Sequence, residues 1–69
     1  MMKFENLFNV MHCDFFEIQK AGEELQHIEY EMSGKMLKAC KPYFNDDVID
    51  FYIIKSKTSS ETGLLIRLA

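Results

Sequence analysis

Four side chains of the types that bind zinc are scattered along the chain, namely His12, Cys13, His27 and Cys40. Cysteine and histidine are the preferred ligands of Zn²⁺, and four of them close a structural site. Their spacing contains no C-x-x-C pair, and Cys40 falls on the apolar stripe of a predicted helix, where a free cysteine behaves as a small hydrophobic residue. We therefore predict no metal ion and no cofactor, with the histidines at the surface.

A catalytic cysteine is the second candidate, because Cys13 stands between His12 and Asp14. Adjacent residues on an extended chain point apart, whereas a nucleophile, its base and an orienting acid are assembled in space. No glycine-rich turn or oxyanion-hole signal accompanies this cysteine. The pattern favours an ordinary loop thiol. A chain this short also has difficulty building a deep cleft shielded from water, so we predict that the protein is not an enzyme.

Three aspartates lie close together at Asp46, Asp47 and Asp50. Paired carboxylates can act as acid and base when their surroundings separate their pKa values. These aspartates follow a predicted helix end, however, where aspartate is an ordinary turn former, and Asp50 is expected on one face of a strand. We interpret them as structural.

Glutamates gather on one predicted hairpin and give the chain its most distinctive surface. Glu17, Glu29 and Glu31 share the outward side of two strands, and two more glutamates lie at the tip. Such a cluster is either a solvated surface that favours solubility or a docking face for a basic groove on another protein. For the docking interpretation, the candidate partner-binding residues are Glu17, Glu29, Glu31, Asp50 and Tyr52.

Composition limits the class of protein. The 69 residues are 48% hydrophobic with one proline and three glycines, which predicts a single domain over residues 1–69. The net charge of −3 has the wrong sign for direct nucleic-acid binding. No run is long enough for a membrane span, and the first residues do not resemble a signal peptide. Two cysteines in a chain of this size favour free thiols, so we expect a cytoplasmic protein.

Hydrophobic periodicity predicts the elements that carry these residues. Helical spacing indicates helices over residues 3–11 and from Ser33, as N-cap, to a break or kink at Lys41 before Pro42. Alternation indicates a hairpin in which Ile18 faces Ile28 and Phe16 faces Tyr30. Residues 48–54 form the strongest strand and are expected in the sheet interior. A polar connection over 55–63 then leads to a last strand over 64–68.

The expected fold is α+β, with the order αββαββ and an antiparallel-rich four-stranded sheet whose helices pack on one face. Ile49, Phe51 and Ile53 would then join the core. The opposite face would be lined by four apolar side chains, those of Val48, Tyr52, Ile54 and Leu65. Because a monomer rarely exposes a large apolar patch, this face suggests either self-association as a homodimer or the binding of a partner protein.

The order of elements resembles small phage and mobile-element proteins of Gram-positive bacteria. The residues that carry the likeness are Phe16-Glu17-Ile18, Ile28-Glu29-Tyr30, the lysine-bearing helix, residues 47–52 and residues 64–68. Such proteins include anti-CRISPR and other anti-defence inhibitors. The resemblance implies a non-enzymatic protein-binding module that occupies the basic surface of a host defence protein in the host cytoplasm. The alternative is a structural or regulatory accessory protein that dimerises through its apolar outer sheet face.

Overall fold

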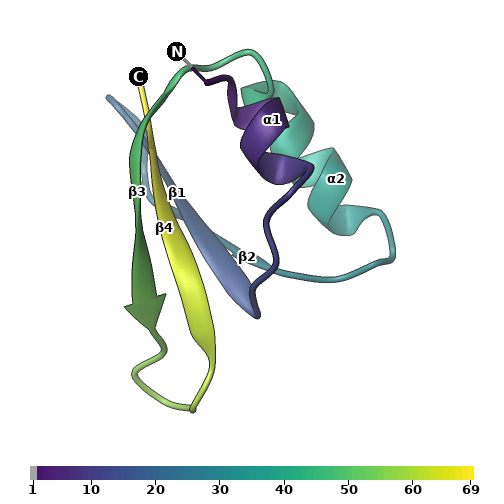
Figure 1. Cartoon of the computed structure of the whole chain (residues 1–69), viewed down its shortest axis with the longest axis vertical. Coiled ribbons are helices and arrows are strands. Elements are labelled where there is room, and N and C mark those ends of the chain that lie inside the picture. Colours follow the sequence, from purple (N-terminus) through teal and green to yellow (C-terminus); the bar gives the residue numbers. More distant parts are fainter. Residues whose placement is uncertain (1) are drawn as a thin grey trace.

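The computed structural model describes residues 2–69 and contains two short helices against one sheet (Figure 1). In chain order the elements are α1 (Phe4–Phe8), β1 (Phe15–Lys20), β2 (Gln26–Glu29), α2 (Lys35–Cys40), the 3₁₀ turn η1 (Lys41–Tyr43), β3 (Val48–Lys55) and β4 (Thr62–Leu68). The predicted αββαββ order is confirmed. None of the helices within residues 2–69 has the length and apolar character that a membrane crossing requires.

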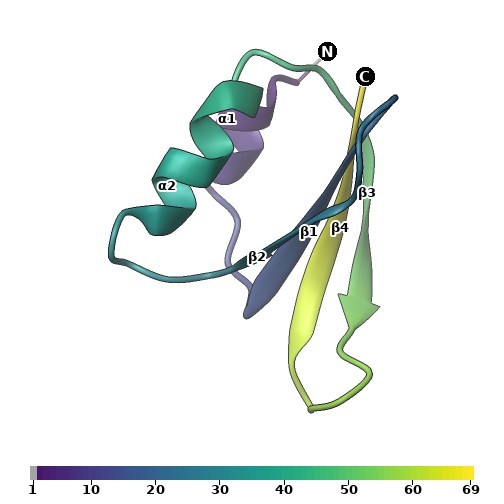
Figure 2. The same ribbon diagram turned by 180° about the vertical axis from the view of Figure 1, so that it is seen from behind.

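The four strands lie side by side in the order β2-β1-β4-β3. The β1–β2 and β3–β4 pairs are antiparallel, whereas β1 and β4 run parallel at the centre. Both helices lie on the same side of the sheet, as the two opposite views show (Figures 1 and 2). The structure is therefore an α+β domain with an antiparallel-rich sheet covered on one face. We call the covered side the inner face and the other the outer face.

The core lies between the helices and the two central strands. Phe4 and Leu7 of α1 and Cys40 of α2 pack with side chains of β1 and β4, and Phe16 and Ile66 are completely buried. The first helix ends at Phe8 rather than at residue 11. Met11 is still buried because the chain turns back after the helix, with the Met11 amide donating to the Leu7 carbonyl at 3.0 Å.

The hairpin register differs from the prediction by two residues. Phe16 pairs with Ile28 and Ile18 pairs with Gln26, so the predicted Ile18–Ile28 and Phe16–Tyr30 pairs are wrong. A shift of two residues leaves every side chain on its predicted face, because strand side chains alternate with a period of two. The turn sets the register: Glu23 donates its amide to the Lys20 carbonyl, with Gly22 at a φ of 81° that favours glycine.

The start of α2 is stabilised by a different residue from the one predicted. Gly34 occupies the N-cap position and makes no side-chain cap, so the prediction of Ser33 as N-cap is wrong. The Glu31 carboxylate accepts the amides of Ser33 at 3.0 Å and Met36 at 2.8 Å. A carboxylate takes this role well because it is negatively charged beside free helix amides. The helix becomes a 3₁₀ turn at Lys41, as the following proline predicts.

Strand β3 lies at the edge of the sheet, so its predicted interior position is wrong. The parallel pairing of β1 with β4 places the last strand in the centre and pushes β3 outward. Ile49, Phe51 and Ile53 are exposed instead of joining the core. Val48 is buried in the core rather than lying on the outer face, because the pairing register shifts between Val48 and Asp50.

Candidate functional site

A histidine held between two glutamates lies on the outer face at the hairpin. His27 is directly opposite Glu17, and its Nδ1 lies 3.0 Å from Glu17 Oε2 while its Nε2 lies 3.1 Å from Glu29 Oε1. A protonated imidazole donates from both nitrogens and satisfies both carboxylates. Hydrogen bonding to Glu17 and then to Glu29 therefore raises the pKa of His27 above its ordinary value of 6.5. When His27 is protonated, its positive charge offsets part of the predicted acidic surface.

An aromatic ring packs against the imidazole of this histidine. Phe15 stacks on His27 with 5.2 Å between ring centroids and an interplanar angle of 24°. Phe15 is only 5% exposed although it belongs to the outer face, because its ring lies across Gly63 of the neighbouring strand. Phe15 and His27 also line a wide hollow of about 650 Å³ that extends to Ile54 and Lys55.

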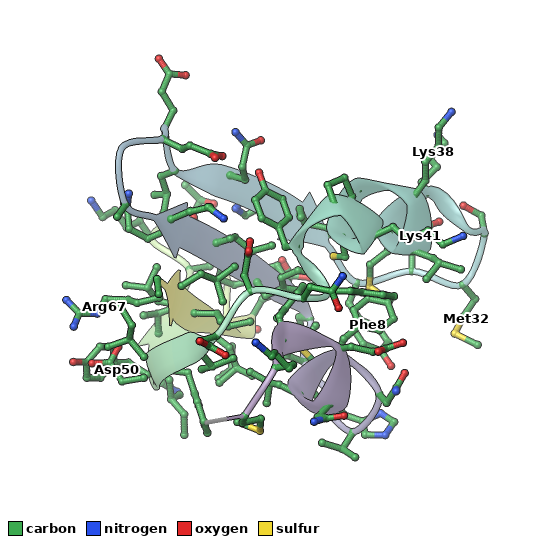
Figure 3. All side chains as sticks on the ribbon, turned by 90° about the horizontal axis from the view of Figure 1, so that it is seen from above. Phe8, Met32, Lys38, Lys41, Asp50 and Arg67 are labelled. Atoms are coloured by element: carbon green, nitrogen blue, oxygen red, sulfur yellow. The ribbon has the colours of Figure 1, made fainter. Side chains whose placement is uncertain are left out.

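Asp50, another predicted binding residue, forms an ion pair with Arg67 between strands β3 and β4. Arg67 donates from Nε to Asp50 Oδ1 at 2.7 Å and from Nη2 to Asp50 Oδ2 at 2.9 Å, and the two side chains lie together in Figure 3. The Tyr52 hydroxyl donates to Asp50 Oδ2 at 3.0 Å. The Arg67 guanidinium therefore holds the pKa of Asp50 below its ordinary value. Asp50 is a compensated charge.

The fifth predicted binding residue, Glu31, does not lie with the others. Its carboxylate is turned toward α2, where it also accepts the Ser33 hydroxyl. The Ser33 and Met36 hydrogen bonds lower the pKa of Glu31. The outer face therefore carries two separate groups. Glu17 and Glu29 lie with His27 on β1 and β2, and Asp50 and Tyr52 lie with Arg67 on β3 and β4. Glu31 instead serves the start of a helix.

The predicted apolar outer face is smaller than expected. Of its four predicted members, Val48 is in the core, Ile54 and Leu65 are half-buried, and only Tyr52 is exposed, at 51%. The larger apolar exposure lies on the inner side of β3. Phe51 is 46% exposed and Ile53 is 74% exposed, because the helices leave this strand uncovered.

The free edge of β3 presents backbone groups as well. The Ser56 amide donates to the Glu61 carbonyl at 3.0 Å, and hydrogen-bonded pairs recur at every second residue of an antiparallel ladder. The amides and carbonyls of Phe51, Ile53 and Lys55 consequently point away from β4. At one end the edge is covered, since Val48 donates to the Met2 carbonyl at 2.9 Å. Within residues 2–69, no segment pairs with the edge over 49–55, which we call the open edge.

The opposite edge of the sheet has a different character. Strand β2 has four residues, and its exposed side chains are polar, including His27 and Glu29. Short strands with charged side chains are protected against pairing with other chains. Strand β3 has eight residues and exposes Ile49, Phe51, Tyr52 and Ile53. The open edge is therefore the side of the sheet best suited to accept another strand.

The candidate catalytic and zinc-binding residues are not gathered into a site. Cys40 is buried on the inner face, and burial raises its pKa to about 12, whereas His27 lies on the outer face. Desolvation and then the Asp14 charge raise the pKa of Cys13. Among residues 2–69, no three histidine, cysteine or acidic side chains are grouped to hold a metal ion.

The three aspartates are likewise separated. Asp46 pairs with Lys20 at 2.7 Å, Asp47 with Lys3 at 2.8 Å, and Asp50 with Arg67. Each carboxylate has its own cation, and none is paired with another carboxylate. This arrangement fits the structural interpretation made from the sequence.

Comparison with known proteins gives no match to a family model, a curated protein or a solved structure. The residues of the candidate site are therefore identified from the geometry of the structure. Sequence reasoning missed several of its features, among them the exposure of β3 and the contact between Phe15 and Gly63. Strand β3 is exposed because it is the last strand in the sheet order, and the residue pattern of a strand does not indicate its place in that order. The Phe15–Gly63 contact had one signal, since an isolated glycine in a strand indicates the close approach of another group.

Proposed function

We propose that the chain is a non-catalytic protein-binding domain that accepts an extended strand of another polypeptide along the open edge. The observation that carries this proposal is the coincidence of free backbone groups and exposed apolar side chains over residues 49–55. Strand addition obtains affinity from main-chain hydrogen bonds and specificity from alternating side-chain contacts. Both kinds of contact are available on this strand.

The inner side of the added strand would contact Phe51 and Ile53, which are the most exposed apolar residues there. Its outer side would lie next to Asp50 and Tyr52. Covering apolar surface supplies the main driving force, at about 25 cal/mol per Å². The hydrogen bonds add direction and register, because each must match a free amide or carbonyl.

Charge makes a smaller contribution in this proposal than apolar burial does. Asp50 is bound by Arg67, and Glu17 and Glu29 share His27, which adds a second positive charge when it is protonated, so part of the acidic face is compensated. The net charge of −3 still favours a partner with a basic surface through longer-range attraction. The narrower proposal of a host defence protein as the partner is supported by the resemblance in size and element order.

The test compares variants that charge the edge with one that charges another exposed apolar position. Ile53→Lys places a lysine on the open edge, where lysine opposes strand addition. Met32→Lys is the matched control, since Met32 is 91% exposed and lies at the other end of the molecule from Asp50 and Arg67 (Figure 3). Immobilised proteins are incubated with host-cell extract, and bound proteins are quantified by mass spectrometry.

We expect any protein that binds the open edge to be retained by the wild type and by Met32→Lys and lost with Ile53→Lys. Glu29→Lys, assayed at low and high salt, tests the acidic face in the same experiment. If Glu29→Lys abolishes binding while Ile53→Lys does not, the acidic face is the binding surface and strand addition is wrong. The same bound proteins in all variants would also contradict the proposal.

A further inference from the structure

We infer that the strand accepted by the open edge is β3 of a second copy of this chain, paired antiparallel about a two-fold axis at Tyr52. This inference rests on the proposed strand addition and adds the identity and register of the partner. A two-fold interface uses the same patch on both subunits, so the patch must complement itself. The open edge meets this condition in its length, its hydrogen-bond phase and its side chains.

The length of the open edge determines the register. Pairing of Met2 and Lys3 beside Asp47 and Val48 covers one end of β3, and the strand ends at Lys55 on the other. Two copies of the uncovered stretch overlap completely only when position 49 of one faces position 55 of the other. The centre of that overlap is Tyr52, which then faces Tyr52 of the second copy.

The hydrogen-bond phase is compatible with this register. Phe51 and Ile53 both have backbone groups that point away from β4, and in this arrangement Phe51 of each copy faces Ile53 of the other. These two pairs supply about four backbone hydrogen bonds. A displacement by one residue would place outward-pointing groups opposite residues already bonded to β4, so it is excluded.

The side chains are complementary in the same register. A two-fold axis perpendicular to the sheet keeps the helices of both copies on one side and forms a continuous sheet of eight strands. Phe51 and Ile53 lie opposite Ile66 and Leu64 of β4, which face the core, so they belong to the inner face. The two Phe51 and two Ile53 side chains would therefore cover one another there, while the two Tyr52 rings meet on the outer face.

The area predicts a weak, reversible dimer. Ile49, Phe51, Tyr52 and Ile53 each expose on the order of 100 Å² of side chain, and the backbone edge adds to this. The total for two copies is about 1,000 Å², which is at the low end for specific protein interfaces. We therefore expect a dissociation constant in the micromolar range.

The first test measures the oligomeric state by sedimentation velocity over a concentration series. We expect a monomer–dimer equilibrium in the wild type and in Met32→Lys. Ile53→Lys, and separately Phe51→Lys, should weaken dimerisation on the order of 100-fold, because each dimer loses two buried apolar groups and gains two charges. Circular dichroism tests whether each variant is folded. If Ile53→Lys does not fold, Phe51→Lys provides the same test of the interface.

The second test reports the register. With Cys13 replaced by serine, Tyr52→Cys brings two thiols together across the two-fold axis, where opposed Cα atoms are about 4.5 Å apart and a disulfide can form. Ile54→Cys is the matched control, because the two copies of position 54 are displaced by four residues, or about 13 Å. We expect oxidation to yield a covalent dimer only with Tyr52→Cys.

The outcomes separate this inference from the proposed function. A wild-type monomer at all concentrations, or equal cross-linking of the two cysteine variants, overturns the second copy as occupant. If Ile53→Lys still loses a partner from cell extract in that case, strand addition stands and the occupant is a different protein. A dimer unaffected by Ile53→Lys and Phe51→Lys contradicts the open edge as its interface. Salt gives a further distinction, since it should strengthen pairing of two like-charged copies and weaken binding to a basic partner.

Discussion

Replacing Gly63 by alanine tests how the outer face is held together. Gly63 lies in β4 directly opposite Phe15 of the parallel strand β1. A Cβ at this position would lie 2.6 Å and 2.7 Å from two atoms of the Phe15 ring and 2.7 Å from the Phe15 carbonyl oxygen. Optimal carbon contacts begin at about 3.5 Å, so the methyl group would overlap these atoms. Relief requires movement of both the ring and the backbone.

The expected magnitude comes from two opposing effects. The backbone of Gly63 does not have the positive φ of Gly22 and Gly34, so alanine brings no conformational strain there. Replacing glycine by alanine within a strand normally stabilises by about 0.5–1 kcal/mol. Overpacking a close contact costs about 1–3 kcal/mol. We expect a net loss of about 1 kcal/mol, and at most about 2.5 kcal/mol, which corresponds to a fall of roughly 4–8 °C in Tm for each kcal/mol.

The assay is urea unfolding followed by circular dichroism, combined with a double-mutant cycle. Gly63→Ala, Phe15→Leu and the double variant are compared with the wild type. The cost of Gly63→Ala should be smaller in the Phe15→Leu background, because the ring contact is then relieved while the carbonyl contact persists. An increase in stability with Gly63→Ala, or the same cost in both backgrounds, would refute the role of this contact.

Four other side chains, those of His27, Glu31, Cys40 and Cys13, give direct tests of the structure. The pKa of His27 is raised above 6.5, so its stabilisation is complete below pH 6.5 and is lost as the pH rises through the raised value. The free energy of unfolding of wild type relative to His27→Gln should fall accordingly, and Glu17→Gln should lower the NMR titration midpoint of His27. Glu31 has a lowered pKa, so Glu31→Gln should reduce the urea midpoint at neutral pH, and the difference should close as acid protonates the native carboxylate; an unchanged midpoint would contradict the cap. Cys40 should react with a thiol reagent only when the protein unfolds, whereas the half-buried Cys13 should react in the native state, slowly for a thiol; rapid modification of Cys40 would contradict its place in the core.

The parts of the fold that local chemistry determines were predictable from the sequence. The apolar spacing of Phe4 and Leu7 requires a surface to pack against, and Pro42 ends the regular part of α2 where expected. The faces of β1 and β2 were correct because the period of two survives any even shift. The register itself was not, since Ile18 opposite Ile28 and Phe16 opposite Ile28 bury the same face.

Properties that depend on distant pairing could not be predicted in the same way. Strand β3 is apolar on both sides. This pattern is typical both of a strand in the sheet interior and of an edge strand that pairs with another chain. The parallel pairing of β1 with β4 places β3 at the edge, and the residues of β3 itself do not indicate that pairing. The hydrogen bonding of Glu17 and Glu29 with His27 was missed for a related reason. It requires the correct cross-strand register, in which Glu17 faces His27.

The exposure of β3 follows from the size of the chain together with the order of its strands. The helices have five and six residues, which is too little surface to cover four strands of up to eight residues. The helices pack on the two central strands, β1 and β4, whose side chains form the core with Phe4 and Cys40. A strand added at the open edge covers Phe51 and Ile53 and occupies their free backbone groups in one step. The added strand would bind only the folded chain, so its binding free energy would also stabilise the fold. This contribution matters because a chain of 69 residues buries only a small core.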